Sequence, residues 1–255
     1  MNSWDDMSER YQASVDITTD DVHYGPCGPG ERELRLLGNV KGLSVLDLGC
    51  GGGQNSIALA KSGACVTGID SSARQIDFAR SLAKREGVSI DFVTQGVEAL
   101  EDWLPQSYDI VVSCFCVEYI DLEHFFRSVG HVLKNDGLLV FCDLHPMVSG
   151  ADVVGVSLGS FIESVDYFFR RSIAFEWRFE DGIRVAFARH HRTLEDYFSN
   201  MRRAGFVVED LREPKMFLEE CDRYPYKDLT LRDESEVWRK LPYTLVIKAR
   251  RVPRA

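Results

Sequence analysis

The sequence contains no apolar run long enough to cross a membrane. Its most apolar stretches, residues 110–117 and 138–142, have the length of single β-strands. The first ten residues, MNSWDDMSER, are polar and acidic, which is not the composition of a secretory signal. These absences predict a cytoplasmic protein that does not bind a membrane.

An excess of positive charge is also absent. The chain has 30 lysine and arginine residues against 40 aspartate and glutamate residues, which gives a formal net charge of −10. A long polyanion such as DNA or RNA is not attracted to that balance, so we expect no nucleic-acid partner. Because repeats and interdomain linkers are missing as well, the 255 residues are expected to form a single domain.

The seven cysteines include no CxxC pair, and this spacing disfavours a zinc site. Most of them lie in apolar, strand-like segments, namely Cys65, Cys114, Cys116 and Cys142. We therefore expect reduced, buried thiols and no disulfide.

Strand-like and helix-like segments alternate through residues 43–146. Apolar runs lie at 43–48, 65–70, 89–95, 108–115 and 138–144, with helical segments at 54–63, 72–87, 97–104 and 122–137. This alternation is typical of stacked βαβ units. Runs that are apolar throughout are typical of strands covered by helices on both faces. The pattern predicts an α/β, Rossmann-like fold.

The chain after residue 192 adds one helix and two strands. Thr193 followed by Asp196 is typical of a capped helix start, and Gly205 is typical of a helix end. Residues 206–213 and 243–250 have the composition of strands. Paired as an edge hairpin, these two strands complete a seven-stranded, mostly parallel sheet with helices on both faces.

Residues 147–192 form an insertion after the fifth strand that holds eight aromatic residues. A hairpin over residues 172–190 is predicted to turn at Asp181-Gly182. If Phe179 pairs with Ile183, one face of the hairpin collects Ile173, Phe175, Trp177, Phe179, Val185 and Phe187. That face either packs on the sheet or closes over a ligand as a lid, and it also suits a homodimer contact.

The stretch VLDLGCGGGQNS, residues 45–56, leads from a strand through four glycines into a helix. Such a turn lets a ligand approach the backbone and the positive end of the helix. The dinucleotide fingerprint requires a small residue where this chain has Gln54, so NAD fits poorly. Asp47 suits an amine or a cation, and Asp70 at the next strand end suits ribose hydroxyls. S-adenosylmethionine is a ligand that has a ribose, an amino group and a positive charge.

VLDLGCGGG with VTGID, FVTQGVEAL and YDIVVSCFCVEYI resembles the class I S-adenosylmethionine-dependent methyltransferases that act on small molecules in bacterial metabolism. The resemblance covers residues 40–145 and HHRTLEDYFSNMRRAGF. It implies S-adenosylmethionine as cofactor, S-adenosylhomocysteine as product, and one methyltransferase domain over residues 1–255. That domain would comprise an N-terminal cap segment (1–42), a cofactor-binding core (43–146), an insertion or lid (147–192), and a C-terminal helix with edge strands (193–255).

The resemblance also implies which residues bind the cofactor. Asp47 and the glycine turn would hold the methionyl part, Asp70 the ribose, residues 95–98 the adenine, and residues 113–117 the floor near the sulfonium. The residues expected to bind are Asp47, Gly49, Cys50, Gly51, Gly53, Asp70, Ser71, Gly96, Val97 and Ser113. Many relatives carry an aspartate after the glycine of Gln95-Gly96, a contact for the adenine amino group. Here the Val97 backbone remains, with Gln95 or Glu98 as a substitute.

The residues directly after the fourth strand constrain the methyl acceptor. Enzymes that methylate nucleic-acid bases commonly carry an [ND]PP[YF]-like turn there, and catechol-type enzymes carry acidic magnesium ligands. This chain has Ser113-Cys114-Phe115-Cys116, so we expect neither a nucleic acid nor a metal. The remaining class is a small, aromatic acceptor methylated on oxygen, nitrogen or carbon, the carbon case requiring an indole or phenol.

Four residues are candidates for the catalytic base. His191 shares the parity of the aromatic hairpin face, and His145 follows the fifth strand at the ligand-binding rim. Tyr24 and its neighbour His23 lie on a segment placed to fold over the cofactor, and Glu118 follows the fourth strand. Each also has a purely structural explanation. Trp4, Met7 and Tyr11 share one face of an N-terminal helix, which is expected to dock on the core.

Two other functions stay open. The same fold can bind S-adenosylmethionine in an enzyme that transfers no methyl group, such as a cyclase. It can also serve a methyltransferase for macromolecules or a partner subunit of one, although the acidic charge argues against RNA.

Overall fold

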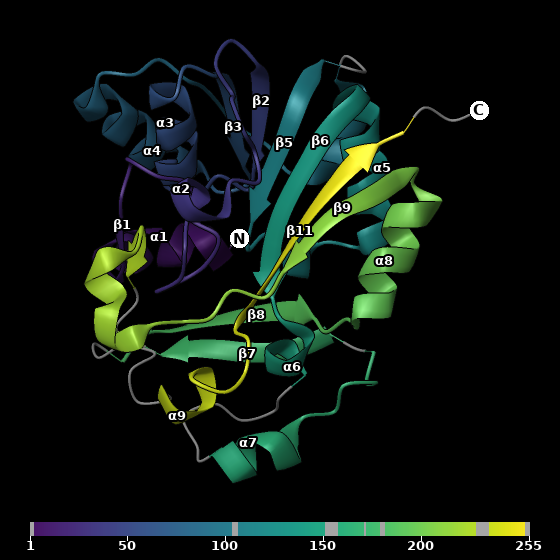
Figure 1. The fold of residues 1–255 in the computed structure, drawn as a ribbon. Coiled ribbons are helices and arrows are strands. Elements are labelled where there is room, and N and C mark those ends of the chain that lie inside the picture. Colours follow the sequence, from purple (N-terminus) through teal and green to yellow (C-terminus); the bar gives the residue numbers. More distant parts are fainter. Residues whose placement is uncertain are drawn as a thin grey trace.

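The computed structural model describes residues 3–103, 107–150, 158–170, 172–178, 182–227 and 235–252. Within them the central sheet has seven strands in the order β4-β3-β2-β5-β6-β11-β9 (Figure 1). The strands are β2 (Ser44–Leu48), β3 (Cys65–Asp70), β4 (Asp91–Thr94), β5 (Tyr108–Cys114), β6 (Leu133–Leu144), β9 (Phe206–Arg212) and β11 (Thr244–Arg251). Strands β2 to β6 pair in parallel, and β11 is antiparallel to β6 and β9. The predicted seven-stranded, mostly parallel sheet is confirmed.

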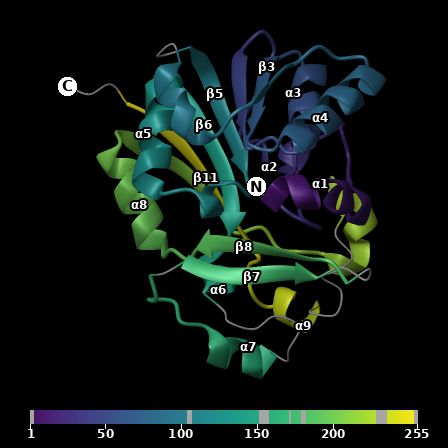
Figure 2. The same cartoon turned by 180° about the vertical axis from the view of Figure 1, so that it is seen from behind.

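Helices cover both faces of this sheet (Figures 1 and 2). One face carries α2 (Glu31–Leu34), α3 (Gln54–Lys61) and α4 (Ala73–Glu86); the other carries η1 (Val97–Asp102), α5 (Leu122–Val132) and α8 (Leu194–Arg203). Consecutive strand residues enter opposite cores: Val45 packs with Leu59, whereas Leu46 packs with Phe125. This two-sided burial is why the strands are apolar throughout.

The boundary between α5 and β6 differs from the prediction of a helix over 122–137. The helix ends at Val132, and Leu133 is already extended and pairs with Tyr108 of β5. The polar residues that follow are exposed, and Asp136 has a left-handed φ of 61°. These polar residues belong to an irregular first part of β6, because Leu133, which precedes them, is buried and already paired with the sheet. The predicted capping box of Thr193 and Asp196 is confirmed at α8.

The insertion forms a separate two-stranded sheet of β7 (Ser172–Arg178) and β8 (Arg184–His190). Phe175 pairs with Phe187, as the predicted register requires, whereas Phe179 and Asp181 lie outside the described residues. The hairpin crosses the carboxyl end of the parallel strands, below α1 (Ser3–Ser14) (Figures 1 and 2). Val185 and Phe187 are buried against Met7, so the aromatic face packs on the N-terminal helix and not on the central sheet.

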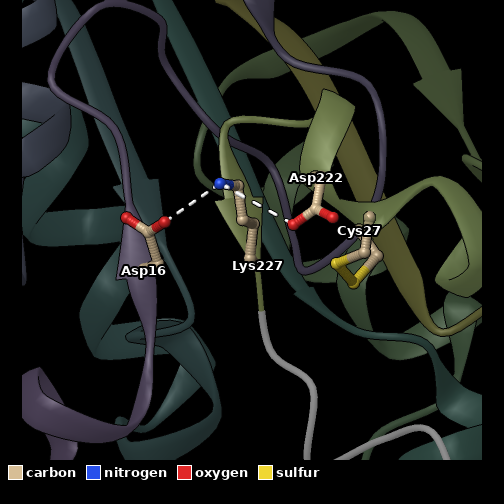
Figure 3. The surroundings of a disulfide bond; sticks show 5 residues. Asp16, Cys27, Asp222 and Lys227 are labelled. Atoms are coloured by element: carbon tan, nitrogen blue, oxygen red, sulfur yellow. Dashed lines mark hydrogen bonds and ion pairs between the residues drawn. A yellow bond between two sulfur atoms is a disulfide. The ribbon is translucent and has the colours of Figure 1, made fainter.

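Segments from the two ends of the chain are joined beside the sheet. β1 (Asp16–Ile17) pairs with β10 (Tyr226–Lys227), and the Lys227 ammonium lies 3.0 Å from Asp16 and 3.9 Å from Asp222 (Figure 3). Next to this pair, Cys27 forms a disulfide with Cys221 of η3 (Leu218–Arg223) (Figure 3). The expectation of reduced thiols is therefore wrong for these two. They lie 194 residues apart, so their meeting depends on the tertiary fold.

Three short helices, α6 (Pro146–Ser149), α7 (Leu158–Ser164) and α9 (Ser235–Trp238), complete the lower part of the molecule (Figure 1). Trp238 of α9 packs edge-on against Phe161 of α7, with ring centroids 5.5 Å apart. The remaining short element is η2 (Val117–Tyr119), directly after β5. Across the described parts of the chain, no helix has both the length and the apolar character needed to cross a bilayer.

Candidate cofactor and acceptor site

A cavity of about 340 Å³ lies at the carboxyl ends of β2, β3 and β5, where ligands bind in open α/β sheets. Its volume is in the range of small-molecule sites. Eight of the ten predicted cofactor residues line it: Asp47, Gly49, Cys50, Gly51, Asp70, Ser71, Gly96 and Val97.

The glycines of the turn differ in what surrounds the position of a side chain. Gly49, Gly51 and Gly53 all have positive φ, at 73°, 52° and 80°. A Cβ on Gly49 would lie 2.5 Å from the Cys116 sulfur, and one on Gly53 would lie 2.8 Å from Ala79 Cβ. A Cβ on Gly51 would meet nothing within 4 Å. Gly53 thus serves helix packing and does not line the cavity, whereas Gly51 lies open to a ligand.

The amino end of α3 is suited to an anionic group. No side chain caps this helix, and its first turn carries no acidic residue. Its first two residues, Gln54 and Asn55, line the cavity. The backbone N–H groups of a first helical turn have no partner within the helix, so they are available to a carboxylate such as that of a methionyl group.

Two carboxylates line the cavity, that of the buried Asp47 and that of the half-buried Asp70. Asp70 accepts hydrogen bonds from the backbone N–H of Gly51 (2.9 Å) and of Ser72 (2.8 Å), and burial raises its pKa. Asp47 accepts from the Ser56 hydroxyl at 2.5 Å, and burial together with the charge of Asp70 raises its pKa to about 6. Both pKa shifts have the direction expected where burial disfavours a negative charge. A cationic ligand offsets that cost.

The predicted adenine end contains four lining residues, Gln95 to Glu98. The Gln95 side-chain oxygen accepts a hydrogen bond from the Trp103 indole at 2.9 Å, so it is already engaged. The Glu98 carboxylate folds back over the Cα of Gly96. Gln95 and Glu98 were the two residues considered as substitutes for the missing aspartate. Because the Gln95 side-chain oxygen is hydrogen-bonded to Trp103, Glu98 is the better candidate.

Ser113 does not line the cavity. It is fully buried, and its hydroxyl donates to the Leu48 carbonyl at 2.9 Å, which ties β5 to the end of β2. The next three residues, Cys114 to Cys116, do line the cavity, and Phe115 has a left-handed φ of 54°. A bulky residue in that conformation is strained, and such strain is typical of functional sites.

Three of the predicted catalytic residues lie outside the cavity with their polar atoms engaged. The His191 ring nitrogens contact the Ser149 hydroxyl (2.8 Å) and the Tyr167 carbonyl (3.0 Å). His145 contacts Glu213 at 2.8 Å and caps α6. The Tyr24 hydroxyl donates to Glu31 at 2.7 Å. These positions support structural roles and do not support a role as general base.

Glu118 is buried behind the cavity wall. Its carboxyl group is hydrogen-bonded to Tyr119, which lines the cavity, and burial together with the charge of Asp143 raises its pKa to about 8. Its Oε2 atom has no hydrogen-bond partner among the described residues. Glu118 itself does not line the cavity.

One part of the cavity lining includes residues of α1, a helix that the sequence predicted only to dock on the core. Trp4, Tyr11 and Gln12 of α1, together with His23 and Tyr119, line the cavity. Trp4 packs edge-on against Tyr119, with centroids 5.8 Å apart. The expected docking face of α1 is present, with Met7 buried, but its two aromatic residues also form the wall of the cavity. Within the described residues no cluster of metal-ligating side chains is found.

Comparisons with known proteins agree with this geometry. Residues 45–137 match the family model described as a methyltransferase domain. A ubiquinone biosynthesis O-methyltransferase of Chelativorans sp. (strain BNC1) is 37% identical over 119 residues, covering 46% of this chain and 44% of that protein. The same-named protein of Coxiella burnetii is 32% identical over 154 residues, covering 57% and 65%. The match thus spans about half the length of these curated relatives.

Solved structures extend the similarity to nearly the whole chain. A Listeria monocytogenes structure assigned to the S-adenosylmethionine dependent methyltransferases has a TM-score of 0.67 and 26% identity, covering 88% of this chain and 98% of that one. A geranyl diphosphate methyltransferase in complex with S-adenosylmethionine has a TM-score of 0.61 at 19% identity, covering 87% and 84%, which shows a shared fold.

Residues 45–137 thus form a methyltransferase domain, and the fold and the glycine turn are those of class I methyltransferases, which use S-adenosylmethionine as their cofactor. Within that class, the sequence is similar to the ubiquinone biosynthesis O-methyltransferases.

Proposed function

We propose that this protein transfers a methyl group from S-adenosylmethionine to a hydroxyl group of a small aromatic molecule. The observation that carries the proposal is the composition of one cavity. The cavity is lined by the glycine turn, by the carboxylates of Asp47 and Asp70, and by the aromatic side chains of Trp4, Tyr11 and Tyr119. The name of the curated relatives supports oxygen as the acceptor atom.

On the cofactor side, the residues would bind and orient each part of S-adenosylmethionine. The amino end of α3 would hold the carboxylate, Asp47 the amino group, and Asp70 with Ser71 the ribose hydroxyls. Glu98 and the Val97 backbone would hold the adenine. The cofactor supplies an electrophilic methyl group on a positively charged sulfur.

On the acceptor side, the aromatic residues would stack on the ring of the acceptor and exclude water. Because Trp4, Tyr119 and Phe187 pack on one another, this wall has a fixed shape. A fixed wall aligns the acceptor oxygen with the methyl group and the sulfur, which direct displacement requires. The hairpin supports the wall from behind, and its action as a lid stays a prediction.

The rival functions differ in what happens after cofactor binding. An enzyme such as a cyclase would bind S-adenosylmethionine and transfer no methyl group. A methyltransferase for macromolecules would need an open binding face, whereas a cavity of about 340 Å³ lined partly by Trp4, Tyr11 and Tyr119 suits a small molecule.

The decisive experiment is a transfer assay with tritium-labelled S-adenosylmethionine and a panel of phenols, catechols, indoles, amines and an RNA mixture. We expect label in phenols or catechols, with the methyl group on oxygen by mass spectrometry. Label only in indole carbon, amines or RNA would contradict the proposal. Cofactor binding without label in any acceptor would favour the non-methylating alternative.

A further inference from the structure

The backbone of His23 is fixed by the elements that build the cofactor site. Its N–H donates to the Asn55 side-chain oxygen at 2.9 Å, and its carbonyl accepts from the Asn55 amide at 3.2 Å. The Cys114 thiol donates to the same carbonyl at 3.4 Å. Asn55 belongs to the first turn of α3 and Cys114 ends β5. The position of His23 is thus tied to the two elements that surround the cofactor.

The His23 ring has open hydrogen-bonding capacity in the cavity. The side chain lines the cavity and is 9% exposed, with its ring against the edge of Tyr226 at a centroid distance of 4.9 Å. Nδ1 is sealed from solvent and has no partner among the described residues. Nε2 is the nitrogen left to meet a ligand. A buried polar atom without a partner is costly, so its retention in a native protein calls for an explanation, and a role in a reaction is one of those known.

The other polar groups of the acceptor side are less suited to take a proton. The Tyr11 hydroxyl is paired with the Tyr226 hydroxyl at 2.9 Å, and the Tyr119 hydroxyl with Glu118. Burial raises the pKa of the Cys116 thiol, and hydrogen bonding with Cys142 together with burial raises that of Cys114. Both sulfurs therefore stay protonated. Burial lowers the pKa of His23 to about 4, so its imidazole is neutral with a free lone pair at physiological pH.

We propose that His23 binds the hydroxyl group of the acceptor through Nε2 and receives its proton during methyl transfer. The inference rests on the proposed O-methyl transfer. As the bond between methyl carbon and acceptor oxygen forms, the carbon–sulfur bond breaks and sulfur keeps its electron pair. The hydroxyl proton moves to Nε2, in the tautomer that carries its other proton on Nδ1. Positive charge leaves the sulfonium as it appears on the imidazole, so the net charge of the cavity is unchanged.

This role selects neutral acceptors with a weakly acidic hydroxyl group, such as phenols and catechols. Asn55 and Tyr226 are positioning residues in this scheme, because they act through the His23 backbone and ring. A phenol that is already ionised needs no proton acceptor. The contribution of His23 must therefore depend on the acidity of the acceptor, whereas a merely structural histidine would affect all acceptors alike.

The test compares His23→Gln with the wild type over phenols of decreasing pKa, ending with a nitrophenol that is ionised at the assay pH. We expect kcat/KM to fall about 100- to 10,000-fold for weakly acidic phenols, the range of general-base catalysis. The loss should shrink toward onefold for the ionised nitrophenol. The affinity for S-adenosylhomocysteine, measured by calorimetry, should change less than twofold. His124→Gln, on α5 and outside the cavity lining, is the matched control and should retain wild-type rates.

An equal loss for every acceptor, or no loss, would overturn the role of His23 while leaving the proposed function intact. If the wild type methylates no phenol at all, the proposed function fails, and this inference fails with it. If His23→Gln loses S-adenosylhomocysteine binding, His23→Asn replaces it, since asparagine is smaller and equally unable to accept a proton at neutral pH. A loss by that variant, relative to the wild type, that is equal for every acceptor would equally overturn the proposal.

Discussion

At the residue scale, some glycines of the turn are required by close packing and one by access to the cavity, and the sequence alone does not distinguish the two. Gly49 and Gly53 are glycines because Cys116 and Ala79 occupy the space of a side chain. Gly51 is glycine because its backbone has positive φ and its open side faces the cavity. The general position of the turn is predictable from the strand–glycine–helix pattern, whereas the separate reasons depend on neighbours far along the chain.

Gly51→Ala is expected to weaken cofactor binding, with Gly38→Ala as the matched control. Both glycines have positive φ and open space where a methyl group would lie, so each substitution should cost about 1 kcal/mol of stability. Only the Gly51 methyl group enters the cavity. Calorimetry should therefore show at least a tenfold loss in S-adenosylhomocysteine affinity for Gly51→Ala and none for Gly38→Ala. Equal affinities of the two variants would place the cofactor elsewhere.

Glu118 makes the stability of the fold depend on pH. Burial and Asp143 raise its pKa to about 8, so the folded protein retains a proton that the unfolded chain loses above an ordinary value of 4.5. Because the native state then binds more protons, the free energy of unfolding falls as the pH rises from about 4.5 to about 8. Denaturant melts across this interval should show a smaller fall for Glu118→Gln than for the wild type. Glu123→Gln, whose side chain is 77% exposed, is the control and should retain the wild-type slope.

At the scale of elements, the N-terminal segment was expected to fold over the cofactor, but the presence of α1 residues in the cavity lining was not expected. Strand and helix order was predictable from periodicity, because buried parallel strands and amphipathic helices have distinct patterns. The contribution of α1 was not, because its aromatic residues serve packing and the cavity at once. His23 lines the cavity, whereas His145 and His191 lie outside it and are hydrogen-bonded to other residues. A single sequence does not show which histidines are hydrogen-bonded in this way.

The disulfide between Cys27 and Cys221 is expected to hold the N-terminal segment over the cavity. That segment carries Ile17 and His23, which line the cavity, and its other ties include a two-residue strand pair and the ion pairs of Lys227 (Figure 3). Cys221→Ser should lower stability by about 2–4 kcal/mol and weaken S-adenosylhomocysteine binding. Cys65→Ser, at an exposed free thiol, should do neither.

A thiol titration of the denatured, unreduced wild type checks the bond itself. Five free thiols are expected, those of Cys50, Cys65, Cys114, Cys116 and Cys142. Seven reactive thiols, together with unchanged binding by Cys221→Ser, would contradict this role.

At the scale of the whole molecule, the central sheet forms the floor of the cavity, and segments added to that sheet form the wall to which we assign the acceptor. The floor was predictable because a parallel sheet places its ligand at the carboxyl ends of its strands. The wall was not, because α1 and the hairpin shape it through contacts between residues distant in sequence, such as Trp4 with Tyr119 and Phe187.

The most direct measurement is a calorimetric titration of S-adenosylhomocysteine into the wild type, Asp70→Asn and Asp77→Asn. Asp70 lies at the cavity and Asp77 has an exposed side chain on α4. We predict binding by the wild type and by Asp77→Asn, and at least tenfold weaker binding by Asp70→Asn, since a hydrogen bond to a charged group is lost. Equal binding by all three proteins, or heat from NAD and none from S-adenosylhomocysteine, would contradict the assignment of this cavity to S-adenosylmethionine.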